Sequence, residues 1–489
     1  MLPRPKTASK NLQDFDPAIF NKSVNITGVA INAQAVKPGD LFIALPGSKT
    51  HGINYVDQAI SNGAVAVLSD KAIDISLPIF ISSNPRQLVG PLSAWIYQNP
   101  FSKLMSVGIT GTNGKTTTAH LLNQIWQSSE LTTGVIGTIG TEIAGKNFTG
   151  ERTTPEACDL QAIAALMIEN KVSHLAMEVS SHALVQGRLT GSHFQIAAFS
   201  NLTQDHLDFH ESMDKYFAAK AILFTPELSD VAVINIDDSY GDKLSNQIKS
   251  KVITVSRSSK AGNWHFKSYL PIQTGFEIEI VNDEGRNISG TFNLLGEHNL
   301  DNLILAVAIA AASGLTDDQI SKAIQKLKSV SGRLEQIELG QKFNALVDYA
   351  HTPDAVARVL AAARKFTSGN LIGILGCGGD RDKGKRPLMG ESLINGADIA
   401  IFTSDNPRSE SPAEILNQMV GQSKVTHPST VIVDRKDAIA HAVSIAKSGD
   451  TIMLLGKGHE VGQEIAGVIT PFDDRIELSK QIKQVIQHD

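Results

Sequence analysis

The sequence feature that most constrains the fold is a glycine-rich turn between an apolar strand and an apolar helix. Residues 107–118 read Val-Gly-Ile-Thr-Gly-Thr-Asn-Gly-Lys-Thr-Thr-Thr. Apolar residues before the turn predict a strand, and Leu121, Ile125 and Trp126 after it mark one face of a helix. Glycines let backbone N–H groups turn toward an anion at the positive end of that helix, and Lys115 adds a full charge. The stretch therefore predicts a nucleotide phosphate-binding loop.

The loop does not match the pattern G-x-x-x-x-G-K-[ST] that many GTPases share, because the glycines before Gly114 are Gly108 and Gly111. The alternative is a turn that only joins a strand to a helix, and the lysine with three threonines argues against it. Thr116 is placed to reach a magnesium ion. The expected nucleotide-binding residues are Gly111, Thr112, Asn113, Gly114, Lys115, Thr116 and Thr117.

The chain of 489 residues is too long for one typical core, and about 150 residues per domain suggest roughly three domains. Hydrophobic residues make up 42% and charged residues 19%, which is typical of globular domains. The formal net charge of -6 gives no basic field for nucleic acid, so we expect no nucleic-acid partner.

Cysteine content and the N-terminal segment indicate the compartment. Cys158 and Cys377 are too few for a disulfide framework or a structural zinc site, which fits a reducing compartment. Residues 1–20 have no apolar secretion-signal core, and no segment approaches the length of a membrane span. These features predict a cytoplasmic protein, which we take to be a monomer.

The chain divides into three predicted α/β domains. Short strands and helices before Asn99-Pro100 predict a small N-terminal domain at 1–100, since proline disfavours helix at the preceding residue. Alternating strands and helices with a polar, β-rich excursion at 251–292 predict a central nucleotide-binding domain of mostly parallel sheet at 101–331. Regular alternation at 332–489 predicts a doubly wound, Rossmann-like domain.

The last domain contains five predicted strands, at 345–349, 371–375, 399–404, 430–433 and 451–455. Polar sequences follow four of them, namely Asp348-Tyr349-Ala350-His351, residues 376–386, Asp405-Asn406-Pro407-Arg408 and Gly456-Lys457-Gly458-His459-Glu460. Ligands of such sheets bind outside the carboxyl ends of the strands, so we expect these sequences to converge on one rim.

Polar residues also follow two strands predicted beside the phosphate loop. Glu178 with nucleotide phosphates is a suitable set for magnesium, which prefers oxygen ligands. His206 is a less typical ligand, and a histidine hydrogen-bonded in the core is the more frequent case. Lys220 lies in a mostly apolar helical stretch at 216–224, where it either reaches out to water or is specifically used; the residues alone favour the first.

Other polar groups have a structural and a functional interpretation. Residues 297–302 open an apolar helix, where Asn299 and Asn302 either cap the helix or bind an adenine edge, and capping is the more frequent role. Arg333 pairs either with phosphate or with Glu335. Hydroxyls, an amide and a cation near the same centre come from Thr153, Thr154, Gln186 and Arg188.

The set of motifs is far more specific than any single one. The motifs are residues 110–118, 178–182, 205–210, 297–302 and 331–335. In combination they resemble the Mur ligases, ATP-dependent amide-forming enzymes of bacterial cell-wall synthesis. The resemblance covers nearly the whole chain and implies a role in peptidoglycan synthesis, and so in cell shape and division. Residues 378–387, 405–408 and 456–460 are similar to those of the family member that adds the third amino acid.

This resemblance implies an enzyme that uses ATP to phosphorylate the D-glutamate side chain of UDP-N-acetylmuramoyl-L-alanyl-D-glutamate, after which an amine attacks the acyl phosphate. Cations dominate such catalysis, because two anions must meet during phosphoryl transfer. The catalytic residues implied are Lys115, Glu178, His206 and Lys220.

The resemblance also assigns ligands. The family residue matching Lys220 carries a carbamate formed with carbon dioxide, which reverses the preference stated above. The implied magnesium ligands are Thr116, Glu178, His206 and carbamylated Lys220. The implied ATP contacts beyond the loop are His298, Asn302, Arg333 and Asp348. The implied contacts with the UDP-muramoyl peptide are Ser48, Lys49, Thr50, Thr153, Thr154, Ser180, Gln186 and Arg188.

The same resemblance implies meso-diaminopimelate as the incoming amino acid. Family members that add it carry an arginine at the end of Asp-Asn-Pro-Arg, here Arg408, and lysine-adding relatives generally lack it. A guanidinium binds the extra carboxylate of diaminopimelate bidentately. The alternative for Arg408 is a proline-set turn with a surface arginine. The implied diaminopimelate-binding residues are Arg381, Asp405, Asn406, Pro407, Arg408, Gly456 and Glu460.

One motif departs from the family. The first domain usually has Asp-Ser-Arg before Pro-Gly-Asp, whereas this chain has Asn32-Ala33-Gln34 before Pro38-Gly39-Asp40. Uridine recognition then relies on backbone groups or on residues 48–50. Three alternative functions stay open: the same reaction with L-lysine, a ligase like folylpolyglutamate synthetase, and a nucleotide-driven switch that performs no ligation.

Overall fold

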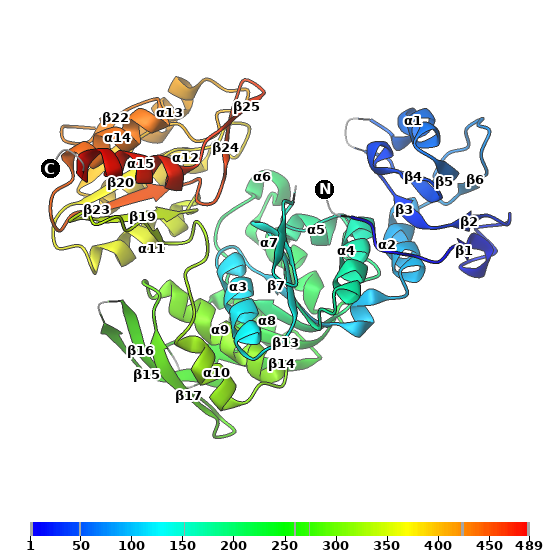
Figure 1. The fold of residues 1–489 in the computed structure, drawn as a ribbon, viewed down its shortest axis with the longest axis horizontal. Helices are drawn as coiled ribbons and strands as arrows, with labels where there is room; N and C mark the ends of the chain where they lie inside the picture. Colours follow the sequence, from blue (N-terminus) through cyan, green and yellow to red (C-terminus); the bar gives the residue numbers. More distant parts are fainter. Residues whose placement is uncertain are drawn as a thin grey trace.

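Three sheets rich in parallel strands organise the molecule (Figure 1). The computed structural model describes residues 3–47, 50–150, 152–258, 261–272, 274–421 and 425–486. Figure 1 shows the N-terminal sheet at the right, the central sheet in the middle and the C-terminal sheet at the upper left. The predicted three-part α/β class is confirmed.

The N-terminal sheet is small and parallel, in the order β3-β4-β5-β6. Its core includes Ile43 and Phe80 and extends to Ala157 and Cys158, which joins this part to the central one. The elements are β1 (Lys10–Asn11), β2 (Asn25–Ile26), β3 (Gly28–Ala30), β4 (Asp40–Ala44), β5 (Ala64–Ser69), β6 (Ile79–Ile81), α1 (Val56–Ser61), α2 (Pro85–Ile96) and 3-10 helices at Leu12–Asp14, Ala33–Ala35 and Gly52–Tyr55.

The described strands of the central sheet have the order β10-β9-β8-β11-β7-β12-β13-β14-β15-β16-β17. Neighbours from β8 to β15 are parallel, and antiparallel pairs lie at both ends. The strands are β7 (Met105–Thr110), β8 (Thr133–Gly137), β9 (Gly140–Ile143), β10 (Lys146–Phe148), β11 (His174–Glu178), β12 (Phe194–Phe199), β13 (Ser229–Asn235), β14 (Lys251–Ser256), β15 (Trp264–Ile272), β16 (Gly275–Asn282) and β17 (Asn287–Phe292). The helices are α3 (Lys115–Ser128), α4 (Ala157–Glu169), α5 (Ser181–Val185), α6 (Leu207–His210), α7 (Met213–Ala221), α8 (Ser239–Ser245), α9 (His298–Ala312), α10 (Asp317–Ile324) and 3-10 helices at Pro100–Lys103 and Ile222–Phe224.

Helices cover both faces of the central sheet. On one face α3 and α9 lie side by side, and Val107 and Ile109 of β7 pack with Trp126 of α3 (Figure 1). On the other face, α4 and α7 pack against alternate residues of β11, including Met177. The β-rich excursion predicted at 251–292 forms β14 to β17 and continues this sheet, so it is not a separate unit.

The strand order brings the predicted motifs together. β11 and β12 flank β7, with Glu178 opposite Ile109 and Phe199 opposite Thr110. The carboxyl ends of three adjacent parallel strands therefore lie at the edge where the phosphate loop leaves β7. This confirms that the motifs after β11 and β12 begin beside that loop.

The C-terminal sheet has the order β18-β19-β23-β20-β21-β22, parallel except for β18. Helices α11, α12 and α13 cover one face and α14 and α15 the other, which confirms the doubly wound prediction. The strands are β18 (Glu335–Gln336), β19 (Asn344–Asp348), β20 (Leu371–Leu375), β21 (Ile399–Phe402), β22 (Thr430–Val431), β23 (Thr451–Leu455), β24 (Gly462–Ile465) and β25 (Val468–Pro471). The helices are α11 (Pro353–Arg364), α12 (Lys385–Gly396), α13 (Pro412–Val420), α14 (Arg435–Ile445) and α15 (Asp474–Ile486).

The domain limits 1–100, 101–331 and 332–489 stay predictions. Within the described residues, no helix is long and apolar enough to cross a membrane. The five strands predicted in the last domain correspond to β19, β20, β21, β22 and β23, with ends that differ by no more than two residues.

Candidate active site

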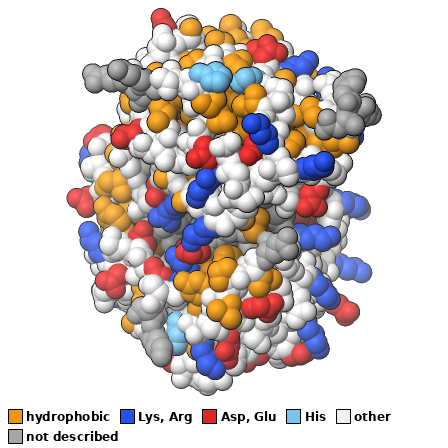
Figure 2. Space-filling model, turned by 90° about the vertical axis from the view of Figure 1, so that its left-hand side faces the viewer, with side chains coloured by type: hydrophobic (Ala, Val, Ile, Leu, Met, Phe, Trp, Pro, Cys, Tyr) orange, Lys and Arg blue, Asp and Glu red, His pale blue; other side chains and the backbone are white. Residues whose placement is uncertain are grey.

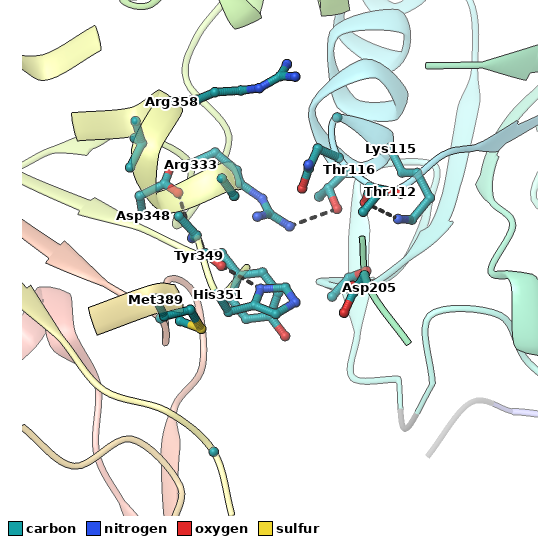
Figure 3. Close-up of a pocket in the computed structure, with 18 of the residues that line it drawn as sticks. Thr112, Lys115, Thr116, Asp205, Arg333, Asp348, Tyr349, His351, Arg358 and Met389 are labelled. Carbon is teal, nitrogen blue, oxygen red and sulfur yellow. Dashed lines mark hydrogen bonds between the residues drawn. The ribbon is translucent and has the colours of Figure 1, made fainter. Parts of the chain in front are cut away.

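A cavity of about 480 Å³ lies between the central and the C-terminal sheets (Figure 3). Figure 3 shows Lys115 and Thr116 on one wall and Arg333 and Tyr349 on the other. Predicted ATP and diaminopimelate residues that line it are Thr112, Asn113, Gly114, Lys115, Thr116, Thr117, His298, Asn302, Arg333, Asp348, Arg381, Asp405, Asn406, Arg408, Gly456 and Glu460. Other predicted residues that line it are Thr153, Glu178, Ser180 and His206.

Some predicted residues do not line this cavity. Among the described residues these are Gly111, Thr154, Gln186, Arg188, Lys220, Pro407 and Thr50. Ser48 and Lys49 lie outside the described residues. The predicted site is therefore brought together at the two facing sheets, and Thr50, the described one of the three N-terminal contacts, does not line this cavity.

Hydrogen bonds from the end of β12 hold the phosphate loop. Thr112 N donates to Asn201 O, and Asn113 N donates to Asn201 Oδ1, each at 2.9 Å. Gly114 has φ of 88°, in the left-handed region that favours glycine. A Cβ at Gly114 would overlap Asn302 Oδ1 of α9. Because α3 begins at the next residue, its N-terminus faces the cavity, as an anion site requires.

Two lysines, the half-buried Lys115 and the fully buried Lys220, donate to one loop carbonyl. Lys115 Nζ and Lys220 Nζ lie 2.9 and 2.7 Å from Gly111 O. Lys220 is 1% exposed, so the interpretation that it reaches out to water is wrong: α7 packs with this side chain turned inward. Burial lowers the pKa of both amines, and the Lys115 charge lowers that of Lys220 further, well below its usual range.

Glu178 lies at the centre of a hydroxyl cluster. Its Oε2 accepts from Thr116 Oγ1 at 2.9 Å and from Thr138 Oγ1 at 3.0 Å, and its Oε1 accepts from Thr138 N at 2.8 Å. The carboxylate is fully buried. Thr116 and Glu178 therefore present two oxygen donors side by side at the base of the loop, as was predicted for a magnesium site.

His206 has a left-handed φ of 53°, which is uncommon for histidine and typical of functional sites. Its ring lies against that of His182, with 4.8 Å between centroids, and its Nε2 lies 3.4 Å from Asp205. Among the described residues, no group of three or more histidines, cysteines or acids is arranged to hold a metal ion.

Several residues predicted to contact the muramoyl peptide are hydrogen-bonded to one another. Thr154 Oγ1 accepts from Ser180 N at 3.0 Å. Arg188 donates to Thr154 O at 3.1 Å and to Gln186 Oε1 at 2.5 Å, and its Nε lies 3.1 Å from Glu156. Of Thr154, Ser180, Gln186 and Arg188, only Ser180 lines the cavity, so Arg188 positions the wall from behind.

Arg333 connects the two sides of the cavity. Its Nη2 donates to Thr116 Oγ1 at 3.2 Å, and its guanidinium lies 4.6 Å from the Tyr349 ring centroid (Figure 3). The alternative pairing with Glu335 is wrong, since that carboxylate accepts from Gly332 N at 2.6 Å and from Ser331 Oγ at 3.1 Å and lies 3.7 Å from Arg475. Arg333 is directed at the phosphate loop.

Asp348 organises the backbone beside Arg333. Its carboxylate accepts from Leu334 N at 2.8 Å and from Ala350 N at 2.7 Å. Burial raises its pKa, although the Arg333 charge opposes this. The side chain that was predicted to contact ATP therefore also fixes the chain segment that carries Arg333.

The capping interpretation of the asparagines in α9 is wrong. The residue before the helix, Glu297, makes no capping hydrogen bond, and α9 begins at His298. Asn299 Nδ2 instead donates to Leu295 O at 2.8 Å. Asn302 packs against the phosphate loop through Oδ1, because α3 and α9 are neighbours in the same layer.

The Asp405–Arg408 turn holds its arginine in a strained conformation. Arg408 has φ of 52°, a region that costs a long side chain of order 1–3 kcal/mol. Backbone bonds to Glu464 O at 3.0 Å and from Ala466 N at 2.7 Å hold it there. Its Nη1 donates to Gly379 O at 2.7 Å, and the side chain is 23% exposed, so it is not a free surface arginine.

The N-terminal motif that departs from the family forms a short turn. Asn32 Oδ1 accepts from Gln34 N at 3.0 Å, and Ala33 is buried with its carbonyl bonded to Asn62 Nδ2 at 2.8 Å. Thr50 Oγ1 accepts from Asn54 Nδ2 at 3.0 Å. These contacts account for the turn itself and leave uridine recognition untested.

Several lining residues were not predicted, namely Thr138, Asn201, Asp205, Tyr349, His351 and Lys385. Asp205 lies in the noticed motif 205–210, and Tyr349, His351 and Lys385 lie in polar sequences that were predicted to meet at the rim. For Asn201, the position just after a strand was the available signal. Thr138 has no local signal. It reaches Glu178 only because β8 pairs with β11.

Sequence comparisons agree with this geometry. Residues 25–101 match the catalytic domain of the Mur ligase family, residues 109–310 the Mur ligase middle domain, and residues 332–458 the Mur ligase glutamate ligase domain. The UDP-N-acetylmuramoyl-L-alanyl-D-glutamate–2,6-diaminopimelate ligase of Streptomyces coelicolor is 44% identical over 476 residues, covering 94% of this chain and 93% of that protein. The chain belongs to the Mur ligase family.

Solved structures of the family share the fold. A structure of a UDP-N-acetylmuramoyl-L-alanyl-D-glutamate–2,6-diaminopimelate ligase has a TM-score of 0.70 and 32% identity, covering 99% of this chain and all of the other. A folylpolyglutamate synthase of Mycobacterium tuberculosis with bound nucleotide has a TM-score of 0.62 at 18% identity, covering 76% of this chain and 92% of the other. The second likeness concerns the fold alone.

The cavity is lined by charged side chains of both signs. The lining cations are Lys115, Arg333, Arg358, Arg381, Lys385 and Arg408, and the lining acids are Glu178, Asp205, Asp208, Asp301, Asp348, Asp382, Asp405 and Glu460. Figure 2 shows lysine and arginine side chains across the middle of one face, between the upper and lower parts of the molecule. Cations such as Lys115 and Arg333 attract phosphate and carboxylate groups.

Replacement of Gly114 by alanine tests the loop. Gly114→Ala should weaken ATP binding about tenfold or more, because the new Cβ meets Asn302 and displaces the cradle. Gly285→Ala is the matched control: its φ is 86°, but nothing lies within 4 Å of the added Cβ. Isothermal titration with ATP measures both, and equal affinities of the two variants would contradict the role of the loop.

Because several histidines are buried, we expect the free energy of unfolding to be smaller in weak acid than at neutral pH. Burial lowers the pKa of two cavity histidines, His298 and His351, and of His459 in the loop after β23 to about 4. The unfolded chain takes up these protons below about pH 6.5 and the folded chain only near pH 4, so the free energy of unfolding should fall between pH 7 and pH 5.

Urea unfolding at both pH values measures the effect. His298→Gln should reduce the difference between pH 7 and pH 5. His193→Gln should enlarge it, because burial lowers the pKa of His193 but the hydrogen bond to Asp230 outweighs this and raises it. A pH dependence that is unchanged in His298→Gln would contradict the assignment.

Proposed function

We propose that the chain is the ATP-dependent ligase that adds meso-2,6-diaminopimelate to the D-glutamate of UDP-N-acetylmuramoyl-L-alanyl-D-glutamate in peptidoglycan synthesis. One observation carries the proposal: a single cavity has the phosphate loop on one wall and the Asp405–Arg408 and Gly456–Glu460 loops on the other. A relative that is 44% identical over nearly the full length bears the name of this activity.

The cavity suits activation of a carboxylate. The γ-phosphoryl group of ATP passes to a side-chain oxygen of D-glutamate and gives an acyl phosphate and ADP; the amine then attacks the carbonyl carbon, and phosphate leaves. The reaction brings two anions together, so the protein must supply cations and alignment. Lys115 at the loop and Arg333 from the facing wall are the cations placed to do so.

The donor set fits magnesium. Thr116 and Glu178 offer a hydroxyl and a carboxylate that share a 2.9 Å hydrogen bond, and magnesium prefers oxygen ligands. These two residues would hold the ion of the ATP, and His206 and a carbamate on Lys220 would complete a second site. A bound magnesium ion neutralises phosphate charge during transfer.

Lys220 is suited to react with carbon dioxide. Only a neutral amine attacks carbon dioxide, and burial favours the neutral form of Lys220. In that reaction the nitrogen lone pair forms the N–C bond and the amine loses a proton, which leaves an anionic carbamate. The product places an anion beside the Lys115 cation.

The facing loops suit an amino acid with an extra carboxylate. Arg408 would bind the distal carboxylate and Glu460 the distal ammonium of diaminopimelate, with Arg381, Asp405, Asn406, Pro407 and Gly456 around them. Both of these charged residues line the cavity. Lysine lacks the carboxylate that Arg408 would pair with, so we expect it to be the poorer substrate.

We assign the remaining residues in the same way. His298, Asn302 and Asp348 would surround ATP, Thr153 and Ser180 would contact the muramoyl peptide, and residues 48–50 would contact the uridine part. We further propose a cytoplasmic monomer, which the two free buried cysteines suit.

Product mass after reaction with each amino acid tests the proposal. With ATP, magnesium and the UDP-muramoyl dipeptide, diaminopimelate should give the tripeptide product and lysine much less. Arg408→Ala should reduce kcat/KM for diaminopimelate about 100-fold, since a buried carboxylate loses its partner at about 1.5–3 kcal/mol.

The same assay separates the alternatives. Turnover with lysine and not diaminopimelate would overturn the specificity, and product from a folate and glutamate would favour a folylpolyglutamate synthetase-like ligase. ATP binding without any peptide product would favour a nucleotide switch.

Carbon-13 NMR in the presence of labelled bicarbonate tests the carbamate. A protein-bound carbamate resonance should appear and should be absent from Lys220→Gln. Lys215→Gln is the matched control, because this lysine is in the same helix with 63% of its side chain exposed. A resonance that survives in Lys220→Gln would exclude this lysine as the carbamate site.

A further inference from the structure

We propose that Lys457 is a positioning residue for the incoming amino acid: it fixes Glu460 and Asn406 in the arrangement that receives the distal end of that substrate. The inference rests on the function proposed above. It concerns a residue that contacts no substrate itself but organises two of the residues that do.

Lys457 is a fully buried lysine with three acceptors. Its Nζ lies 2.7 Å from Gly462 O, 3.1 Å from Glu460 Oε2 and 3.2 Å from Asn406 Oδ1. Its side chain is 0% exposed. An ammonium has three protons, so each acceptor can receive one. The three acceptors come from three segments: the turn after β21, the turn after β23, and β24.

These bonds fix one oxygen of Glu460. Oε2 accepts from Lys457 Nζ and also from Asn406 Nδ2 at 2.8 Å. Within the described residues, no hydrogen bond to the other carboxylate oxygen is found, and Glu460 lines the cavity with 31% of its side chain exposed. One oxygen is therefore anchored in the protein, and the other is available to a ligand ammonium.

The same ammonium sets the orientation of the Asn406 amide. Asn406 Oδ1 accepts from Lys457 Nζ and from Glu464 N at 3.0 Å, so its Nδ2 must point toward Glu460. Asn406 lies between Asp405 and Arg408 in sequence and in the turn that carries Arg408. Lys457 therefore links the residue proposed for the ligand's ammonium with the turn proposed for its carboxylate.

A buried lysine by itself adds little to the stability of a fold. Burial of an ion pair often costs as much as the attraction returns, and apolar replacements of similar volume are frequently tolerated. Without Lys457, however, Glu460 would keep its charge and lose the partner that holds it. The geometry thus favours a role in binding over a role in folding.

Steady-state kinetics of Lys457→Met test the proposal. The KM for diaminopimelate should rise about tenfold or more, since a charged group loses its anchor. The KM values for ATP and for the UDP-muramoyl dipeptide should stay within about twofold, because their predicted sites are elsewhere. Lys480→Met, an exposed lysine on α15, is the matched control and should leave all three unchanged. Equal changes in all three KM values of Lys457→Met would overturn the proposal.

A double-mutant cycle with Glu460→Gln shows whether Lys457 acts through Glu460. The effects of Lys457→Met and Glu460→Gln on the diaminopimelate KM should be clearly less than additive in the double variant. Additive effects would overturn the proposal. Should Lys457→Met fail to fold by circular dichroism, Lys457→Arg replaces it, because the planar guanidinium keeps the charge but not the three-way geometry.

The wild-type reaction separates this inference from the proposed function. If the wild-type protein forms no product with diaminopimelate, the proposed function has failed. If it forms product and Lys457 variants keep the diaminopimelate KM, only the present inference has failed.

Discussion

The two lysines at Gly111 are the interaction on which the site depends. Lys115 and Lys220 reach the same carbonyl from a loop and from a helix that are far apart in sequence. Two ammonium groups at one carbonyl would repel each other, and burial penalises both charges, so the neutral form of Lys220 is favoured. Any group that adds negative charge there relieves the repulsion. A phosphate at the loop does so, and so does conversion of Lys220 to a carbamate.

The site is also divided between two walls. The phosphate loop is fixed by β12 and α9, and the facing loops are fixed by contacts inside the C-terminal sheet. Arg333 bridges the two through Thr116. A cavity built in this way can hold ATP on one side and an amino acid on the other. Its catalytic geometry then depends on how the two walls approach each other.

The local sequence pattern was enough to predict the helices and strands, but it did not predict how they pack against one another. The order of apolar strand, glycine turn and apolar helix predicted the loop, and polar sequences after successive strands predicted the rim. Whether the Lys220 side chain is buried could not be predicted from its helix, because the sequence of α7 does not say which side packs on the core. Asn302 could not be placed either, since its contact with Gly114 depends on α3 and α9 being neighbours. Lys457 was within a recognised motif, but its three acceptors lie in segments that only the fold brings together.

Buried cations explain why the C-terminal wall is rigid. Arg435 is fully buried, pairs with Asp474 at 2.6 Å and donates to the carbonyls of Ser404 and Leu455. Those carbonyls lie where the chain leaves β21 and β23, so the arginine ties together the starts of both ligand loops. Lys457 ties the same loops one step further along. A guanidinium or ammonium can satisfy several carbonyl and carboxylate oxygens at once, which an apolar side chain cannot. Parallel strands end in unpaired polar groups at the ligand rim. Interior cations bind these groups and so order the loops there, while the rim itself stays open to substrate.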